Sequence, residues 1–280
     1  MYIFISIKLY ITCNISYKYS LKPYKMSMIF QSILVILVAY LCYTIITNTK
    51  SMNKMIEKGI AFFKKNFSLK KLEVGEYQKV LVYKVLPFNS KVYEVDKLGI
   101  LAVMTMNVGL MEMYTFNINP YNKDLAQLTI DYIIFLNNRK LYVEIYDLMI
   151  DKEEQNYKDF LKKIEDINKE NADLKDFTSK ESWHNEYLSG MIKKSGSVRD
   201  DDKLLKIFND VMTAYIDYAK KAPELNETAQ KKKYDLIKDF SDKLVEKGGV
   251  AINNFKKTLG DEKTNEFLGN VLYGYKHITS

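Results

Sequence analysis

Apolar and polar residues alternate between residues 78 and 148, which is the pattern of half-buried β-strands. The runs are rich in β-branched and aromatic residues, which favour strands. Six strands are predicted, at Gln78–Leu86, Lys91–Val95, Ile100–Val108, Met113–Asn119, Leu128–Leu136 and Lys140–Leu148. Because the connections are short, we expect an antiparallel meander and not parallel strands joined by helices.

The pattern changes after Asp151, where apolar residues recur about every 3.6 positions, as on one face of a helix. Residues 171–197 are less regular. Helices are predicted at Met52–Asn66, Lys152–Lys169, Asp201–Lys221 and Thr228–Glu246, with one or two more over Val250–Leu259 and Asp261–Tyr273. This order indicates an α+β fold, an α/β/α sandwich in which helices flank a central antiparallel sheet of six or more strands.

The stretch Met28–Thr47 contains no charged residue and is long enough to span a bilayer. Three interpretations fit it: an uncleaved membrane anchor, a cleaved signal sequence, or part of an organelle leader. A buried helix of the folded domain is the structural alternative. We therefore expect residues 1–50 to be a leader or anchor, and residues 51–280 to form the folded domain.

Charge and composition exclude several classes of protein. Residues 1–50 carry five lysines and no acidic residue, so of the net charge of +7 only +2 (7 − 5) remains for the other 230 residues, too little for a nucleic-acid binder. Both cysteines, Cys13 and Cys42, precede the predicted domain, so no disulfide framework or thiolate metal site is expected. The two histidines, His184 and His277, lie in no metal-binding or catalytic motif.

One acidic residue, Asp131, interrupts the apolar strand Leu128–Leu136. A carboxylate there can face water on a one-sided sheet. It can also point into a pocket, where burial would raise its pKa and let it hold a proton at neutral pH. A proton donor to a bound substrate needs that property.

Three stretches carry a resemblance to a known family. Residues 117–120, followed by 128–132, have the order strand, proline, and then strand with aspartate. Residues 209–224 form a helix with an aspartate before an Ala-Pro break, and residues 259–273 are similar to a closing helix. With these stretches, the chain resembles the ferredoxin-dependent bilin reductases and red chlorophyll catabolite reductase over about residues 52–276.

The resemblance implies a function and a site. Asp131 would be the central proton donor, and Asp210 a second acid that reaches across a pocket between sheet and helices. Asp217 is an alternative for that second role, and an ordinary exposed helix carboxylate is the structural alternative for Asp210. Thr115 and Asn117 would contact the substrate, a linear tetrapyrrole such as biliverdin. No bound cofactor or metal is expected, because electrons would come from reduced ferredoxin.

The chain also departs from the family. Some bilin reductases carry a histidine near the position of Thr115, and none occurs there. This favours a second interpretation, a non-catalytic tetrapyrrole-binding or interaction protein of the same fold, tethered to a membrane through residues 28–47. A third is a membrane-anchored protein of an unrelated α+β fold. The leader predicts a plastid or other organelle as the location, and the anchor predicts a membrane.

Overall fold

The computed structural model describes residues 28–179 and 182–278. The chain divides into two compact units, Met1–Tyr43 and Thr44–Ser280. The second unit holds the whole sheet and both hydrophobic cores. The helix α2 (Met28–Asn66) contributes residues to both units, and its part from Thr44 onward belongs to the second.

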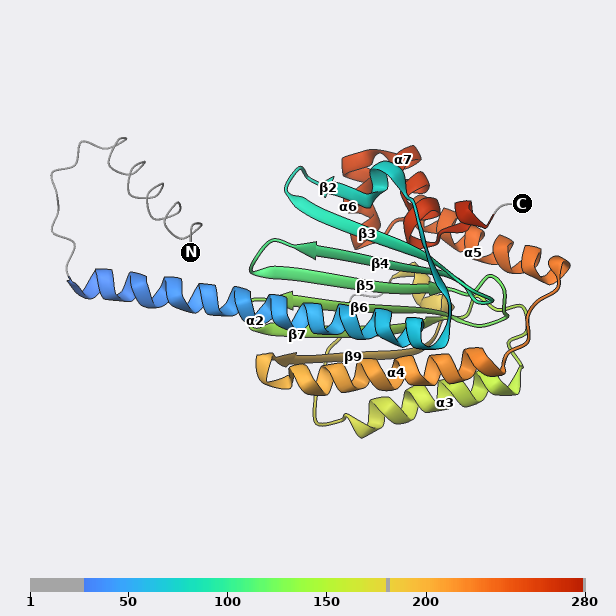
Figure 1. Cartoon of the computed structure of the whole chain (residues 1–280), viewed down its shortest axis with the longest axis horizontal. Helices are drawn as coiled ribbons and strands as arrows, with labels where there is room; N and C mark the ends of the chain where they lie inside the picture. Colours follow the sequence, from blue (N-terminus) through green and yellow to red (C-terminus); the bar gives the residue numbers. More distant parts are fainter. Residues whose placement is uncertain (1–27, 180–181, 279–280) are drawn as a thin grey trace. The chain divides into compact units, whose positions relative to one another are not determined.

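A nine-stranded antiparallel sheet forms the centre of the second unit (Figure 1). Its order is β1-β3-β4-β5-β6-β7-β9-β8, and β2 pairs with β3 as a branch. The strands are β1 (Leu69–Leu72), β2 (Lys79–Val82), β3 (Leu86–Val95), β4 (Gly99–Asn107), β5 (Met111–Asn119), β6 (Gln127–Phe135), β7 (Asn138–Tyr146), β8 (Lys175–Asp176) and β9 (Leu188–Ser197). The predicted α+β fold with an antiparallel sheet of six or more strands is confirmed.

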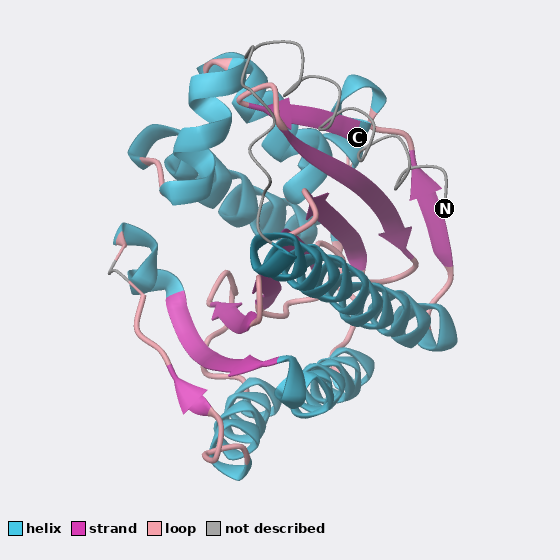
Figure 2. Ribbon diagram, turned by 90° about the vertical axis from the view of Figure 1, so that its left-hand side faces the viewer, coloured by secondary structure: helices cyan, strands magenta, loops and turns pink. Residues whose placement is uncertain are grey.

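Helices cover both faces of the sheet, as Figure 2 shows. One face packs against α2 and against α3 (Gln155–Glu170) and α4 (Asp201–Lys221). The other packs against α5 (Glu227–Lys247), α6 (Val250–Leu259), α7 (Asp261–Phe267) and the π-helix η4 (Leu268–Leu272). Short 3-10 helices lie at η1 (Gly75–Gln78), η2 (Trp183–Tyr187), η3 (Val198–Asp200) and η5 (Tyr275–His277).

Strand β6 shows how the sequence builds two different faces. Leu128, Ile130, Tyr132 and Ile134 are all completely buried against the layer of α2, α3 and α4. The alternate residues of the strand point the other way, because side chains alternate between the faces of a sheet. Asp131 belongs to this second set, on the side of α5 to α7.

Two predictions about strands were wrong: the single strand Gln78–Leu86, expected to end at Pro87, is β2 and the first residue of β3, and β9 was not predicted. Pro87 does not end a strand but lies within β3, where it pairs only with Leu81 of β2, beyond the last residue that β4 pairs. Proline is tolerated at this position because β4 does not pair with it, so no backbone N–H donor is needed toward β4. The strand β9 was missed in the irregular stretch, because its glycines, serines and lysines have low strand propensity and its pairing with β7 forms it.

The folded unit also begins earlier than residue 51. Asn48 is almost completely buried and its side-chain oxygen accepts a hydrogen bond from Arg139 Nη2 at 2.9 Å. Arg139 in turn donates to Asp201 at the start of α4. This network joins α2, the start of β7 and α4, so residues 44–50 are part of the fold.

The described residues of the first unit, 28–43, are helical. Within the described chain, α2 is the one helix that is long and apolar enough to cross a membrane. Length and composition alone support this, and a signal sequence near an N-terminus would pass the same test. The anchor and leader interpretations therefore both stay predictions.

Candidate active site on the sheet

A row of four side chains crosses the sheet on the side of α5 to α7. The strand register pairs Thr115 of β5 with Asp131 of β6. It then pairs Asp131 with Tyr142 of β7, and Tyr142 with Lys193 of β9. Residues paired across neighbouring strands point to the same face. Asp131, Tyr142 and Lys193 are half-buried, so the row can be reached from solvent.

Asp131 is the chemically distinctive member of this row. The pKa of its carboxyl is raised from 3.8 to about 7, chiefly by burial and to a lesser extent by the nearby negative charge of Glu144. Thr115 Oγ1 donates a hydrogen bond to Asp131 Oδ1 at 2.5 Å, which opposes the shift. The balance leaves a carboxyl that exchanges its proton near neutral pH, as a general acid must.

Asn117, Thr129 and Glu144 form a second row beside the first. Asn117 Oδ1 accepts hydrogen bonds from Thr129 Oγ1 and Gln127 Nε2, each at 2.8 Å. Asn117 Nδ2 donates to the carbonyl of Leu272 at 2.7 Å. Asn117, expected to contact substrate, is thus engaged in fixing the end of η4 over the sheet.

Glu144 is the centre of a small charged cluster. It lies 3.9 Å from Lys193 Nζ and accepts a hydrogen bond from the hydroxyl of Tyr146 at 2.7 Å. The ring of His184 lies 6.1 Å from that of Tyr146, centroid to centroid. Burial lowers the pKa of His184, so the imidazole is neutral at pH 7. The cluster brings a carboxylate, an ammonium group and a neutral imidazole to the face that carries Asp131.

Sequence reasoning missed Tyr142, Glu144 and Lys193. The first two could have been found, because the predicted hairpin of two adjacent strands places them opposite Asp131 and Thr129. Lys193 could not, since its strand was not recognised. Nothing in the sequence around residue 193 indicates that it pairs with β7.

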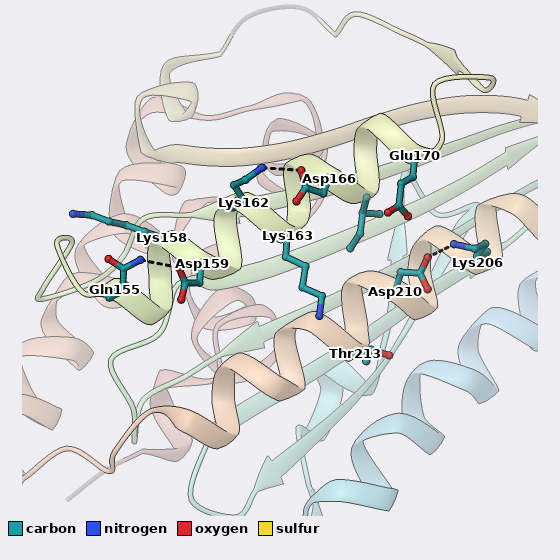
Figure 3. Close-up of a pocket in the computed structure, with 11 residues that line it drawn as sticks. Gln155, Lys158, Asp159, Lys162, Lys163, Asp166, Glu170, Lys206, Asp210 and Thr213 are labelled. Carbon is teal, nitrogen blue, oxygen red and sulfur yellow. Dashed lines mark hydrogen bonds and ion pairs between the residues drawn. The ribbon is translucent and has the colours of Figure 1, made fainter.

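Asp210 and Asp217 do not join this site, and the expectation that they share a pocket with Asp131 is wrong. Both lie on α4, which packs on the opposite face of the sheet. Asp210 is ion-paired with Lys206 at 2.6 Å and lines an open hollow of about 930 Å³ between α3 and α4 (Figure 3). Asp217 is exposed. The buried face of α4 consists of apolar residues, so both carboxylates point away from the sheet.

The hollow in Figure 3 has few features of a ligand site. Lysines and carboxylates of α3 and α4 line it, and several pair with each other, as Lys162 does with Asp166 at 3.0 Å. Ligand pockets are mostly apolar with a few polar groups, unlike this charged surface. Within residues 28–179 and 182–278, no group of three or more metal-ligating side chains could hold a metal ion.

No protein-family model matches the sequence, and no curated protein matches it. A similar solved structure is the crystal structure of phytochromobilin synthase from tomato in complex with biliverdin. The TM-score is 0.66 at 13% identity, over 81% of this chain and 85% of that chain. The two proteins share a fold. The α+β architecture expected from the order of strands and helices agrees with this shared fold.

Proposed function

We propose that this chain is a bilin reductase-like oxidoreductase. It would reduce a linear tetrapyrrole with electrons from reduced ferredoxin. The observation that carries the proposal is Asp131, a carboxyl with a pKa of about 7 on a half-open sheet face. The shared fold with a synthase crystallised with biliverdin supports a linear tetrapyrrole as the substrate class. The ferredoxin partner, the absence of a bound cofactor and the organelle location rest on the family resemblance alone.

In this proposal Asp131 supplies a proton to the bound substrate. Thr115 holds Oδ1, which leaves Oδ2 to carry the proton. Reduction of one double bond consumes two electrons and two protons, so Asp131 must be reprotonated, and its pKa near 7 allows this at neutral pH. After transfer, the hydrogen bond from Thr115 stabilises the carboxylate. Lys193 provides a positive charge on the same face for an anionic substituent of the substrate.

A non-catalytic tetrapyrrole-binding protein is the second candidate. It is favoured because neither Asp210 nor Asp217 supplies a second acid to the face that bears Asp131. Such a protein would bind the pigment and would not reduce it. The two candidates differ in turnover and not in binding.

The test is an absorbance titration of the whole chain with biliverdin, followed by reduced ferredoxin under anaerobic conditions. We expect a red-shifted bound spectrum that bleaches or shifts to the blue on reduction. Asp131→Asn should bind the pigment but lose turnover. Asp235→Asn is the matched control, because Asp235 is an exposed carboxylate on α5 that pairs with Lys231.

The outcomes separate the candidates. Binding without turnover in the unmodified chain would support the non-catalytic protein. Turnover that persists in Asp131→Asn would remove Asp131 from the mechanism. If neither biliverdin nor another linear tetrapyrrole binds, the proposal fails and only the shared fold remains.

A further inference from the structure

Exposed apolar side chains gather on three hairpin tips of the folded unit. The tips are residues 83–85, 108–110 and 135–137, at the connections of β2 to β3, β4 to β5, and β6 to β7; Phe135 is the last residue of β6. Val85 is 67% exposed and Phe135 is 53% exposed. Tyr83 and Val108 are also exposed. Turns normally carry polar residues, so large apolar side chains at three of them need an explanation.

The three tips lie at the same end of the sheet. The pairs that close these hairpins are Val82 with Leu86, Asn107 with Glu112, and Phe135 with Asn138. In an antiparallel meander every second turn falls at the same end, and Figure 1 shows the β2–β3, β4–β5 and β6–β7 connections there. The second and third tips are joined directly, since the amide of Leu136 donates to the carbonyl of Leu110 at 2.8 Å.

The helix α2 passes the same end. A Cβ atom on Gly109, at the second tip, would lie 3.7 Å from Ile45 Cδ1, so α2 runs against this turn. Ile45 and the next residue, Ile46, are exposed. Immediately before them in the sequence comes the apolar, helical stretch that is long enough to cross a membrane.

The distribution of charge is equally one-sided. The three tips contain one lysine, Lys84, and no carboxylate. Among the residues that the structure describes, exposed large hydrophobics outside α2, the tips and the adjoining Leu81 occur only at Ile150, Met191 and Leu236. Among the described residues, most of the exposed large hydrophobics therefore lie on α2, on the three tips and on the adjoining Leu81.

We propose that this end of the folded unit rests on a lipid bilayer, with the three hairpin tips inserted in its interface. A bilayer fits because the tips expose aromatic and aliphatic side chains near Ile45, which follows in sequence an apolar stretch long enough to cross a membrane. Aromatic residues favour the membrane interface. Lys84 can reach lipid phosphates from this position. The candidate active site faces sideways from this surface, because it lies on a face of the sheet and not at its end.

The experiment uses the whole chain with Cys13 and Cys42 replaced by serine. Single cysteines are introduced as Val85→Cys, Phe135→Cys and Leu236→Cys and are labelled with the environment-sensitive dye NBD. Leu236 is the matched control, since it is an exposed apolar residue on α5. Each protein is placed in nanodiscs of phosphatidylcholine and phosphatidylserine, with or without lipids that carry a doxyl quencher below the headgroup.

We expect a blue shift of NBD emission at positions 85 and 135 and the loss of most of that emission with the quencher. Position 236 should show neither effect. Equal, weak quenching at all three positions would overturn the proposal. A blue shift that is insensitive to the quencher but rises with protein concentration would also overturn it, and would assign the tips to contact with a second copy of the chain. Circular dichroism melting of each variant confirms folding.

Discussion

Asp131→Asn tests the most important electrostatic inference directly, without any substrate. The folded protein raises the pKa of Asp131 from 3.8 to about 7. The folded state therefore binds this proton more tightly than the unfolded state does. Between these two values the unfolded chain releases the proton first, so the stability of the protein falls as pH rises. Asparagine has no proton to lose, so the variant lacks this contribution.

The magnitude follows from the shift. A difference of about 3 pKa units corresponds to roughly 4 kcal/mol, at about 1.4 kcal/mol per unit. About 3 kcal/mol of this falls between pH 5 and pH 8, because the unfolded carboxyl is already mostly ionised at pH 5. Relative to the unmodified protein, Asp131→Asn should therefore gain about 3 kcal/mol of stability over that interval. The gain is independent of any constant cost from weakening the hydrogen bond with Thr115.

The assay is chemical denaturation in urea at pH 5 and pH 8, for both proteins. The decisive quantity is the change in the difference between the two free energies of unfolding, because other titrating groups cancel in it. If the difference is the same at both values of pH, Asp131 has an ordinary pKa and cannot serve as a general acid at neutral pH. A change of the opposite sign would mean that its ionised form is stabilised by the fold.

Three further predictions concern neighbouring features. Thr115→Val removes a hydrogen bond that lowers the pKa of Asp131, so the alkaline limb of the pH–rate profile should move to higher pH; a shift to lower pH would contradict the geometry. Asp210→Asn should leave bilin turnover unchanged in the anaerobic assay, because Asp210 pairs with Lys206 on the opposite face of the sheet. A large loss of turnover would mean that Asp210 takes part in the reaction. Arg139→Met should lower the free energy of unfolding, measured in urea, by about 3–5 kcal/mol, because it leaves Asp201 without its buried partner. A decrease under about 1 kcal/mol is typical of an exposed ion pair and would contradict this.

The sequence determined the fold class and most of the elements by itself. Alternation of period two and recurrence of period 3.6 are local properties, so the strands around Asp131 and the helix Asp201–Lys221 could be located from them. The sequence also marked Asp131 as unusual, because a single carboxylate in an apolar strand must either face water or be perturbed. Thr115 was named only through the family resemblance, and the strand register shows that it pairs with Asp131.

Only the tertiary structure decided which carboxylates share a site. Asp131 and Asp210 are both acidic residues in elements that were predicted correctly, but the sheet lies between them. The apolar periodicity of a helix shows which of its own faces is buried, and not which face of the sheet it packs against. The same holds for Lys193, whose strand exists because β7 offers it hydrogen bonds. Burial, and therefore the pKa of Asp131, depends on contacts between distant segments. Local sequence fixes what each element is, and packing fixes what its side chains can do.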